Sequence, residues 1–345
     1  MRKKSEAKNN TFKKLRIIFV VLFTMGAVAA VLYEINEFTG IFDRVQQSKE
    51  YGFSGNVKIA CDKVYSMSFS QIKGREPVRI IPLENYVSPK PDPTKYDEKF
   101  DSYVDPTIEV HYHLEVMHDS RFHFFEVKIK HPSQFRYALA YDRYSSLRQL
   151  PTNMAADVNA VAAVSASFYN KRPYGVMIYK RKLVKNNPKD LDVLMIDSEG
   201  DFHIVYDRDI ESSGVLEKHD IVNALSFGPE LVHDGKELEM TRWDWEPFRN
   251  DSRAAICQYD DKLHYLVCVV EAAWHKSKGI TMQTFAHELA AKGVKTAYNL
   301  DGGQSDTMVI GNVRKNRISW GYEKPQGDIL YFATAMEYDQ SHSDA

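Results

Sequence analysis

The sequence contains little cysteine, and its three cysteines form no recognisable motif. Cys61, Cys257 and Cys268 include no CxxC pair and no spacing typical of a zinc site. Two segments expected to pair as a hairpin carry Cys257 and Cys268, and a turn at residues 260–261 would place Cys257 opposite His264. Because the Cα atoms of a disulfide lie within about 7 Å of each other, this register predicts no bridge between Cys257 and Cys268.

The chain also lacks an excess of charge of one sign. It has 45 Lys and Arg residues against 47 Asp and Glu residues, and its net charge of −2 provides no global basic field for nucleic acid. We therefore expect no nucleic-acid partner. No internal repeat is present, and 43% hydrophobic residues in a chain of 345 are ample for the core of one large domain or two small ones.

Charge is unbalanced only at the N-terminus. Residues 1–16 carry seven basic residues and one acidic residue, and residues 17–33 are uncharged and largely apolar. At 1.5 Å per residue, a helix of this second segment spans roughly 26 Å, close to the thickness of a bilayer core. Basic residues on the N-terminal side predict that this end is cytoplasmic. We expect a single-pass anchor in the cell membrane, with the rest of the chain extracellular.

A cleaved signal peptide is the alternative for this segment. Its apolar region would be about 7–15 residues long and would end at a cleavage site of small residues. Residues 25–30 are rich in small residues, but residues 31–33 continue the apolar run. The length of the run favours an uncleaved anchor.

The remaining chain divides by pattern into three parts. Residues 34–104 are predicted to be a stalk and N-terminal extension, with a proline-rich surface loop at residues 88–93. Residues 105–338 are expected to form the folded domain, and residues 339–345 a polar tail. The fold class predicted for this domain is α+β, a strand-rich mixed sheet with a few packed helices, preceded by the N-terminal transmembrane helix.

Short strands and two helices account for this fold class. Alternating or continuous apolar segments of four to eight residues predict strands, here at residues 108–114, 122–129, 160–164, 174–179, 193–197, 202–206, 254–259, 263–270 and 294–300. Residues 151–159 are compatible with a short helix. The clearest helix covers residues 281–292, where apolar side chains recur at helical spacing, Thr281 can cap the start, and Gly293 suits the left-handed residue past the end.

The most informative segment runs Asn-Leu-Asp-Gly-Gly-Gln-Ser-Asp-Thr-Met over residues 299–308. A strand delivers Asn299 and Asp301 to its end. Gly302 and Gly303 then allow the backbone to turn and approach a ligand without a Cβ in the way. Consecutive N–H groups in such a turn can bind a phosphate, and the carboxylate can stabilise a developing oxocarbenium ion. A tight Asp-Gly turn between strands is the structural alternative, and the residues alone do not decide between the two.

This segment resembles the Asn-Leu-Asp-Gly-Gly-Gly-Ser-Ser-Thr-Met signature of the phosphodiester glycosidase family. Four further segments resemble motifs of that family in the same order along the chain. They are Ser167-Phe168-Tyr169 with Pro173-Tyr174-Gly175, Phe227-Gly228-Pro229-Glu230-Leu231-Val232 with Gly235, Arg253-Ala254-Ala255-Ile256, and Gly279-Ile280-Thr281 leading into the helix. The resemblance covers roughly residues 105–338.

The resemblance implies a hydrolase that cleaves a sugar from a glycosyl-1-phosphodiester in a cell-surface or exported glycan. It implies Asp301 as the catalytic carboxylate, with Glu271 as its partner. The substrate-binding residues that it implies are Arg253, Asn299, Gly302, Gly303, Ser305, Asp306, Ser167, Tyr169 and Gly228.

Several positions depart from the family pattern. Ser165-Ala166 replaces Asn-Gly, residues 271–273 read Glu-Ala-Ala instead of Asp-Gly-Arg, Gln304 replaces a glycine, and Asp306 replaces a serine. Two alternatives therefore stay open, a metal-assisted phosphodiesterase and a catalytically inactive carbohydrate- or wall-binding module. The pattern indicates no cofactor and no metal ligands, since His111, His113, His118 and His123 lack a carboxylate at a suitable spacing. A divalent cation stays open.

The predicted topology can be tested on intact cells. Protease added from outside is expected to remove the domain that follows residue 33, because the basic segment holds only the N-terminus inside. The measurement is an immunoblot of the domain, with a cytosolic protein as the control for cell integrity. Protection of both proteins would show that the anchor prediction is wrong.

Overall fold

The computed structural model describes residues 79–240, 249–272, 277–318 and 321–336. The chain forms two compact units, and the unit of residues 66–145 and 149–345 contains the elements below. The predicted basic segment, the anchor at residues 17–33, the stalk up to residue 78 and the polar tail lie outside the described residues. No helix among the described residues is long and apolar enough to cross a membrane.

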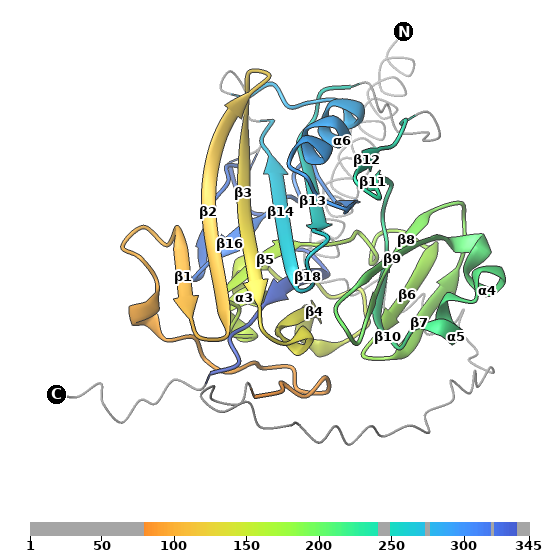
Figure 1. Ribbon diagram of the computed structural model, residues 1–345, viewed down its shortest axis with the longest axis horizontal. Coiled ribbons are helices and arrows are strands. Elements are labelled where there is room, and N and C mark those ends of the chain that lie inside the picture. Colours follow the sequence, from red (N-terminus) through yellow and green to blue (C-terminus); the bar gives the residue numbers. More distant parts are fainter. Residues whose placement is uncertain (1–78, 241–248, 273–276, 319–320, 337–345) are drawn as a thin grey trace, which may run out of the picture. The chain divides into compact units, whose positions relative to one another are not determined.

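The largest sheet of the described part has eight strands (Figure 1). In spatial order they are β1 (Ser102–Asp105), β2 (Ile108–Met117), β3 (Ser120–Ile129), β14 (His264–Val270), β13 (Arg253–Gln258), β15 (Thr296–Leu300), β11 (Glu230–His233) and β12 (Lys236–Glu237). The central strands β13 and β14 are buried along almost their whole length, which explains their continuous apolar sequences.

Two five-stranded sheets complete the fold. One has the order β7 (Lys182–Asn187), β6 (Gly175–Tyr179), β10 (Ile221–Ser226), β8 (Asp192–Asp197) and β9 (Phe202–Tyr206). The other has the order β17 (Val313–Arg314), β16 (Met308–Ile310), β5 (Ala162–Ser165), β18 (Asp328–Phe332) and β4 (Phe135–Leu139). The α-helices are α3 (Pro151–Asp157), α4 (Ile210–Ser213), α5 (Val215–Lys218) and α6 (Met282–Ala291), and the 3-10 helices are η1 (Pro93–Lys95), η2 (Pro132–Gln134), η3 (Ala140–Asp142) and η4 (Asp207–Asp209).

The predicted α+β class is therefore confirmed, but the sheet arrangement differs from the expected single mixed sheet. Each strand pair in the described residues is antiparallel, as the pairs β2–β3, β13–β14 and β8–β9 illustrate. Parallel pairs need a crossover of a dozen or more residues, usually through a helix. In this chain many consecutive strands are joined by short turns instead, and such turns give antiparallel hairpins.

An aromatic cluster joins the three sheets. Phe135 of β4 stacks on Phe332 of β18 with ring centroids 4.8 Å apart, and Tyr265 of β14 lies 5.0 Å from Phe135. Phe202 of β9 contacts both Phe135 and Tyr265. Phe332 is fully buried, and removal of such a ring typically costs about 3–5 kcal/mol of stability. The cluster thus fixes the sheets against one another.

Helix α6 begins and ends as its sequence predicts. The Thr281 hydroxyl accepts the backbone N–H of Thr284 at the start, and Gly293 follows the end with a φ of +76°. The stripe that includes Phe285 and Leu289 is buried against the large sheet. Burial of this stripe positions the turn that leads into β15, the strand that carries the candidate site.

The hairpin register expected for the cysteines is wrong by two residues. Cys257 pairs with Leu266 rather than His264, and Cys268 pairs with Ala255. The hairpin closes with the bond from Tyr259 N–H to the carbonyl of His264, so its loop has four residues instead of two. Cys257 and Cys268 are free and buried.

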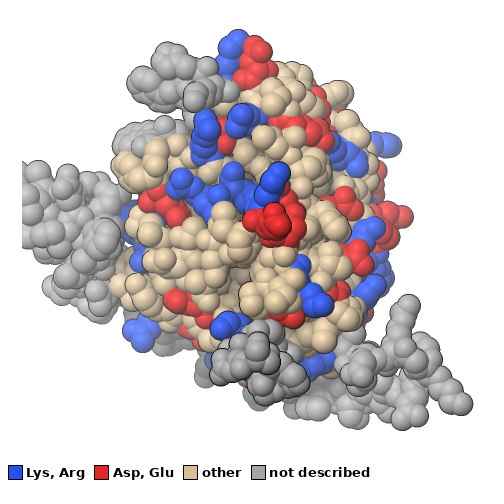
Figure 2. All heavy atoms as spheres, turned by 90° about the vertical axis from the view of Figure 1, so that its left-hand side faces the viewer, with Lys and Arg blue, Asp and Glu red and all other residues tan. Residues whose placement is uncertain are grey.

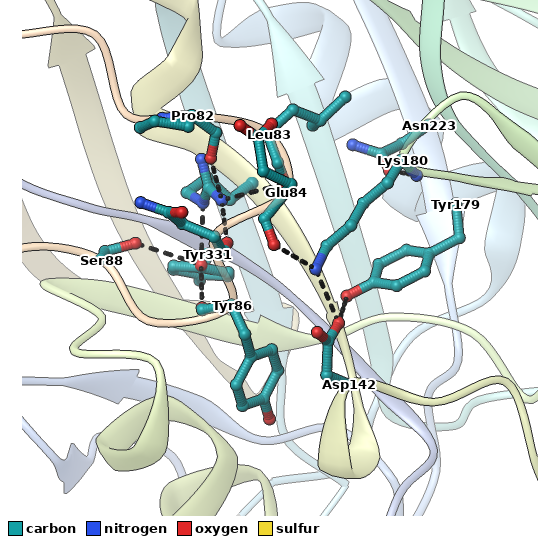
Figure 3. Close-up of polar contacts among 12 residues, drawn as sticks. Pro82, Leu83, Glu84, Tyr86, Ser88, Asp142, Tyr179, Lys180, Asn223 and Tyr331 are labelled. Atoms are coloured by element: carbon teal, nitrogen blue, oxygen red, sulfur yellow. Dashed lines mark hydrogen bonds and ion pairs between the residues drawn. The ribbon is translucent and has the colours of Figure 1, made fainter.

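The segment that precedes β1 is attached to the domain by backbone contacts. The guanidinium of Arg136 donates to the carbonyls of Ile81, Pro82 and Asn85. The ammonium of Lys180 donates to the carbonyl of Glu84 and also to Asp142, 2.7 Å away (Figure 3). Within the predicted extension, residues 81–85 are therefore held on the folded surface.

The face drawn in Figure 2 agrees with the balanced composition. Figure 2 shows one face of the molecule, on which Lys and Arg side chains lie among Asp and Glu side chains. Such mixing is typical of a solvated surface without a long-range field of one sign.

Candidate active site

The turn after β15 lies against the start of β13. Leu300 pairs with Ala254, and the N–H of Asp301 donates to the carbonyl of Ala166 over 2.9 Å. A Cβ on Gly302 would lie 2.7 Å from the carbonyl oxygen of Ser252, which no side chain tolerates. Gly303 has a φ of +68°, a left-handed conformation that glycine adopts freely. The two glycines therefore serve different needs, a close approach and a sharp turn.

This turn borders a cavity of about 190 Å³. Predicted site residues from three stretches of the chain line it, namely Gly228, Arg253, Asn299, Asp301, Gly302 and Gly303. The antiparallel pairing of β15 with β13 and β11 brings these stretches together. The N–H of Asn299 also donates to the carbonyl of Pro229, which holds β15 beside the segment that precedes β11. The structure thus assembles most of the predicted site.

Asp301 is the cavity residue with the most perturbed acidity. Burial raises the pKa of the Asp301 carboxyl to about 6, against the opposing effects of the Ser305 hydroxyl, Arg172 and Lys324. Its Oδ2 atom has no hydrogen-bond partner within the described residues. A carboxyl that ionises near neutrality and has one oxygen without a partner is suited to contact a ligand.

Arg253 supplies positive charge to the cavity, and Arg172 supplies it to the Asp301 carboxyl. The Arg253 guanidinium donates to the carbonyls of Ile280 and Arg249 at 3.2 and 2.8 Å. Arg172 lies over the ring of Phe227, with its guanidinium carbon 4.2 Å from the ring centroid. Burial lowers the pKa of Arg172, and the Asp301 charge opposes this effect. Sequence reasoning missed Arg172, although it directly precedes the Pro-Tyr-Gly motif.

Glu271, the expected partner of Asp301, does not line the cavity. Its side chain is completely buried, and Oε1 accepts hydrogen bonds from His123 Nε2 and from the backbone N–H of Arg317, both at 2.7 Å. Burial acts to raise the pKa of Glu271, but these two bonds outweigh it and the pKa is lowered. Glu271 is therefore an ionised internal anchor between β14, β3 and the segment after β17.

Asp306 and Ser305 are buried behind the turn. The Ser305 N–H donates to the carbonyl of Gly302 and closes the turn. Burial, together with the charges of Asp301, Asp251 and Glu271, raises the pKa of Asp306 well above its usual value. Asp306 is thus influenced by the charges of both Asp301 and Glu271, and its environment favours the neutral carboxyl.

Asp251 and Asp328 are acidic residues that sequence reasoning missed. Asp251 lines the same cavity as Asp301 and is the other carboxylate there. Asp328 starts β18 and accepts bonds from the hydroxyls of Ser167 and Tyr137 at 2.6 and 2.5 Å. Burial raises the pKa of Asp328 to about 7. The signal in the sequence was a charged residue that opens an otherwise apolar strand.

Ser167 and Tyr169 lie beside a second, narrower recess rather than the main cavity. Arg172 and Lys185 also line this recess. Lys185 donates to the carbonyls of Tyr169 and Arg172, and burial lowers the pKa of its ammonium to about 8. The two recesses are linked by the contact of Arg172 with Phe227, a residue that lines the main cavity.

Three of the four histidines of the β2–β3 hairpin have contacts within the protein, and His111 is exposed. His123 binds Glu271, His118 binds Glu288 at 2.7 Å, and the ring of His113 stacks on Phe124. In the part of the chain that the structure describes, one group of ligand atoms is close enough to hold an ion, and it lies in the β8–β9 region at Asp197, His203 and His219.

Comparison with known proteins identifies the class. Residues 158–333, about half of the chain, match the family described as phosphodiester glycosidase. The chain therefore belongs to the phosphodiester glycosidase family.

One solved structure shows the same fold. The catalytic domain of zebrafish N-acetylglucosamine-1-phosphodiester alpha-N-acetylglucosaminidase, auto-inhibited by its pro-peptide, is similar with a TM-score of 0.54 and 15% identity, over 71% of this chain and 86% of that one. A hypothetical protein from Synechocystis is similar with a TM-score of 0.49 and 13% identity, over 65% of this chain and 62% of that one. A search of curated proteins finds no match.

The raised pKa of Asp301 predicts a pH-dependent gain in stability for the variant Asp301→Asn. A carboxyl whose pKa rises from 3.8 to about 6 on folding destabilises the native state progressively between these pH values, and fully above them. The amide removes this cost. The melting temperature of the variant should therefore exceed that of the wild type by a margin that grows as pH rises from 4 to about 6 and stays constant above that pH. A wild type that is more stable than the variant at pH 7 contradicts the assignment.

Proposed function

We propose that the protein hydrolyses a glycosyl-1-phosphodiester and releases the sugar, with Asp301 as its catalytic carboxylate. The observation that carries this proposal is the placement of Asp301. Asp301 lines the cavity at the end of β15, and its carboxyl has a pKa of about 6 and one oxygen without a hydrogen-bond partner in the described residues. The turn beside it requires glycine at positions 302 and 303. Membership of the phosphodiester glycosidase family supports the same chemistry in general terms.

The phosphodiester would be held at the start of β13 by arginine side chains and by the backbone of the glycine turn. Arg253 lines the cavity and can engage two phosphate oxygens at once, as a planar guanidinium does well. Gly302 and Gly303 expose their backbone to the same space because neither has a side chain. Arg172 adds a second positive charge close to Asp301.

The sugar would then lie with its anomeric carbon facing Asp301. The bond between that carbon and the phosphate oxygen breaks, and the electron pair leaves with the phosphate. The ionised Asp301 stabilises the resulting oxocarbenium character, either as a nearby charge or by bond formation. Water adds to the anomeric carbon and loses its proton. Because a phosphate is already a good leaving group, no general acid is needed for it to leave.

The other acidic residues divide into two roles. We assign Asp251, the second carboxylate of the cavity, to the attacking water, since it is placed to accept a proton there. Glu271 and Asp306 are assigned positioning roles, because both are buried behind the turn and neither lines the cavity. This proposal therefore does not assign to Glu271 the catalytic role that the family resemblance implied.

We further propose that the substrate lies outside the cell, in a wall teichoic acid or an exopolysaccharide. Support comes from the seven basic residues followed by the apolar run at residues 17–33, which indicate a membrane anchor with its domain extracellular. Glycosyl phosphodiesters are accessible to an anchored enzyme in such polymers.

Substitution of the carboxylate tests this function. Asp301→Asn is expected to fold normally and to lose at least a hundredfold of turnover, because each 1.36 kcal/mol of lost transition-state stabilisation costs about tenfold in rate. The measurement is sugar release from a panel of glycosyl-1-phosphate diesters that differ in sugar and alcohol.

A matched control is Asp260→Asn, an exposed aspartate that pairs with Lys295 at 3.1 Å and follows the end of β13 opposite to the cavity residue Arg253. This control is expected to keep full turnover. A folded Asp301→Asn protein that retains more than about a tenth of wild-type turnover contradicts the assignment. A wild type that binds members of the panel but releases no sugar would instead favour the inactive binding module.

A further inference from the structure

Three side chains with metal-binding chemistry converge on one face of the β9–β8–β10 region. Asp197 ends β8 and pairs with Ile221 of β10, and on its other side its N–H donates to the carbonyl of Asp201 just before β9. His219 lies two residues before Ile221, and His203 lies two residues after Asp201. Residues two apart on a strand share a face, so the strand pairing places both histidines beside the Asp197 carboxylate.

The ligand atoms of this group lie close to the separations found around a metal ion. Oδ2 of Asp197 lies 2.8 Å from Nε2 of His203 and 3.7 Å from Nδ1 of His219. All three ligand atoms lie within 4.8 Å of one another. The second carboxylate oxygen, Oδ1, accepts the backbone N–H groups of Glu199 and Asp201, each at 2.9 Å. These two bonds fix the carboxylate so that Oδ2 faces the histidines, as outer partners do for metal ligands.

We propose that Asp197, His203 and His219 bind one divalent transition-metal ion of the Zn²⁺ type, with water in the fourth position. Tetrahedral coordination with bonds of about 2.0–2.2 Å separates neighbouring ligand atoms by about 3.3–3.5 Å. The Asp197–His219 distance is already close to this value. The His203 ring needs to withdraw from Asp197 by only about half an ångström, which breaks a hydrogen bond and replaces it with a metal bond.

The donor set selects the class of ion. Two imidazole nitrogens and one carboxylate oxygen suit Zn²⁺, Ni²⁺, Cu²⁺ and Fe²⁺, whereas Mg²⁺ and Ca²⁺ prefer oxygen ligands throughout. The two imidazole rings lie with centroids 3.7 Å apart. Nε2 of His203 and Nδ1 of His219 both lie near the same oxygen, Oδ2 of Asp197.

An ordinary ion pair explains only part of the arrangement. His203 and Asp197 form a normal hydrogen bond, but His219 is 3.7 Å from Asp197, too far for one. His219 is also partly exposed at 37% of its side-chain surface. A metal ion would give His219 a direct ligand bond and would connect three segments of the chain, β8, β9 and the turn between α5 and β10.

The site is separate from the candidate active site. Gln258, the last residue of β13, binds the carbonyl of Gly200 and the N–H of Phe202 in the β8–β9 turn. Arg253, at the other end of the same strand, lines the cavity. Five residue steps of about 3.3 Å separate these ends by roughly 16 Å. The ion would therefore stabilise the five-stranded sheet that contains β8, β9 and β10 rather than take part in the proposed reaction.

Metal titration of the chelator-treated protein tests this proposal. Isothermal titration with Zn²⁺ is expected to show one saturable site, and Co²⁺ is expected to give the visible absorption of a four-coordinate ion. At a hundredfold excess of Zn²⁺ over Kd, the Tm should rise by about 5 °C or more. Mg²⁺ should produce neither effect.

Variants identify the ligands and decide the outcome. His203→Gln and His219→Asn should each weaken Zn²⁺ binding at least tenfold and abolish the rise in Tm. His233→Gln is the matched control, since His233 is an exposed histidine that also pairs with a carboxylate, Glu230, at 2.8 Å, and it should bind Zn²⁺ like the wild type. No saturable binding, or binding that is unchanged in both His203→Gln and His219→Asn, would overturn the proposal.

Discussion

The candidate site depends on one close approach, between the backbone of Gly302 and the carbonyl of Ser252. No Cβ fits there, because it would lie 2.7 Å from that oxygen. The contact holds the end of β15 against the start of β13, so that Asp301 lines the same cavity as Arg253. Strand pairing brings the two segments side by side, and the absent side chain allows them to meet. The geometry that we assign to catalysis follows from this backbone contact.

The arrangement has an energetic cost, which the rest of the fold offsets. Burial raises the pKa of the Asp301, Asp306 and Asp328 carboxyls, so each would be less costly to the native state in its neutral form. Bonds to Asp328 from Ser167 and Tyr137 reduce part of that cost. The aromatic cluster shared by the three sheets supplies apolar burial. Acidic groups with perturbed pKa values therefore gather where the family chemistry is expected, as is usual for functional sites.

The sequence predicted the parts of this structure that local patterns encode. Helix α6 was predicted within one residue because spacing, cap and terminal glycine agree, and β9 was predicted over its full length. Strands β4 and β18 were missed, because a short buried strand within a chain of many apolar segments has no distinctive period. Around the cavity, the Asp-Gly-Gly turn was found as a contiguous motif. Arg172 and Asp251 were missed because only tertiary packing brings them near it, and Glu271 was placed in the site although its side chain faces His123 of β3.

Whether the reaction occurs at carbon or at phosphorus is the most direct test of the account, and heavy-oxygen water distinguishes the two. The wild-type protein is incubated with a glycosyl-1-phosphodiester in ¹⁸O-labelled water, and the phosphate product, whose oxygens exchange slowly, is analysed by mass spectrometry. Attack at the anomeric carbon assisted by Asp301 predicts an unlabelled phosphate monoester and label on the released sugar, which is trapped by rapid reduction. Heavy oxygen on the phosphate would show attack at phosphorus and would contradict the assignment of Asp301 as a glycosidase carboxylate.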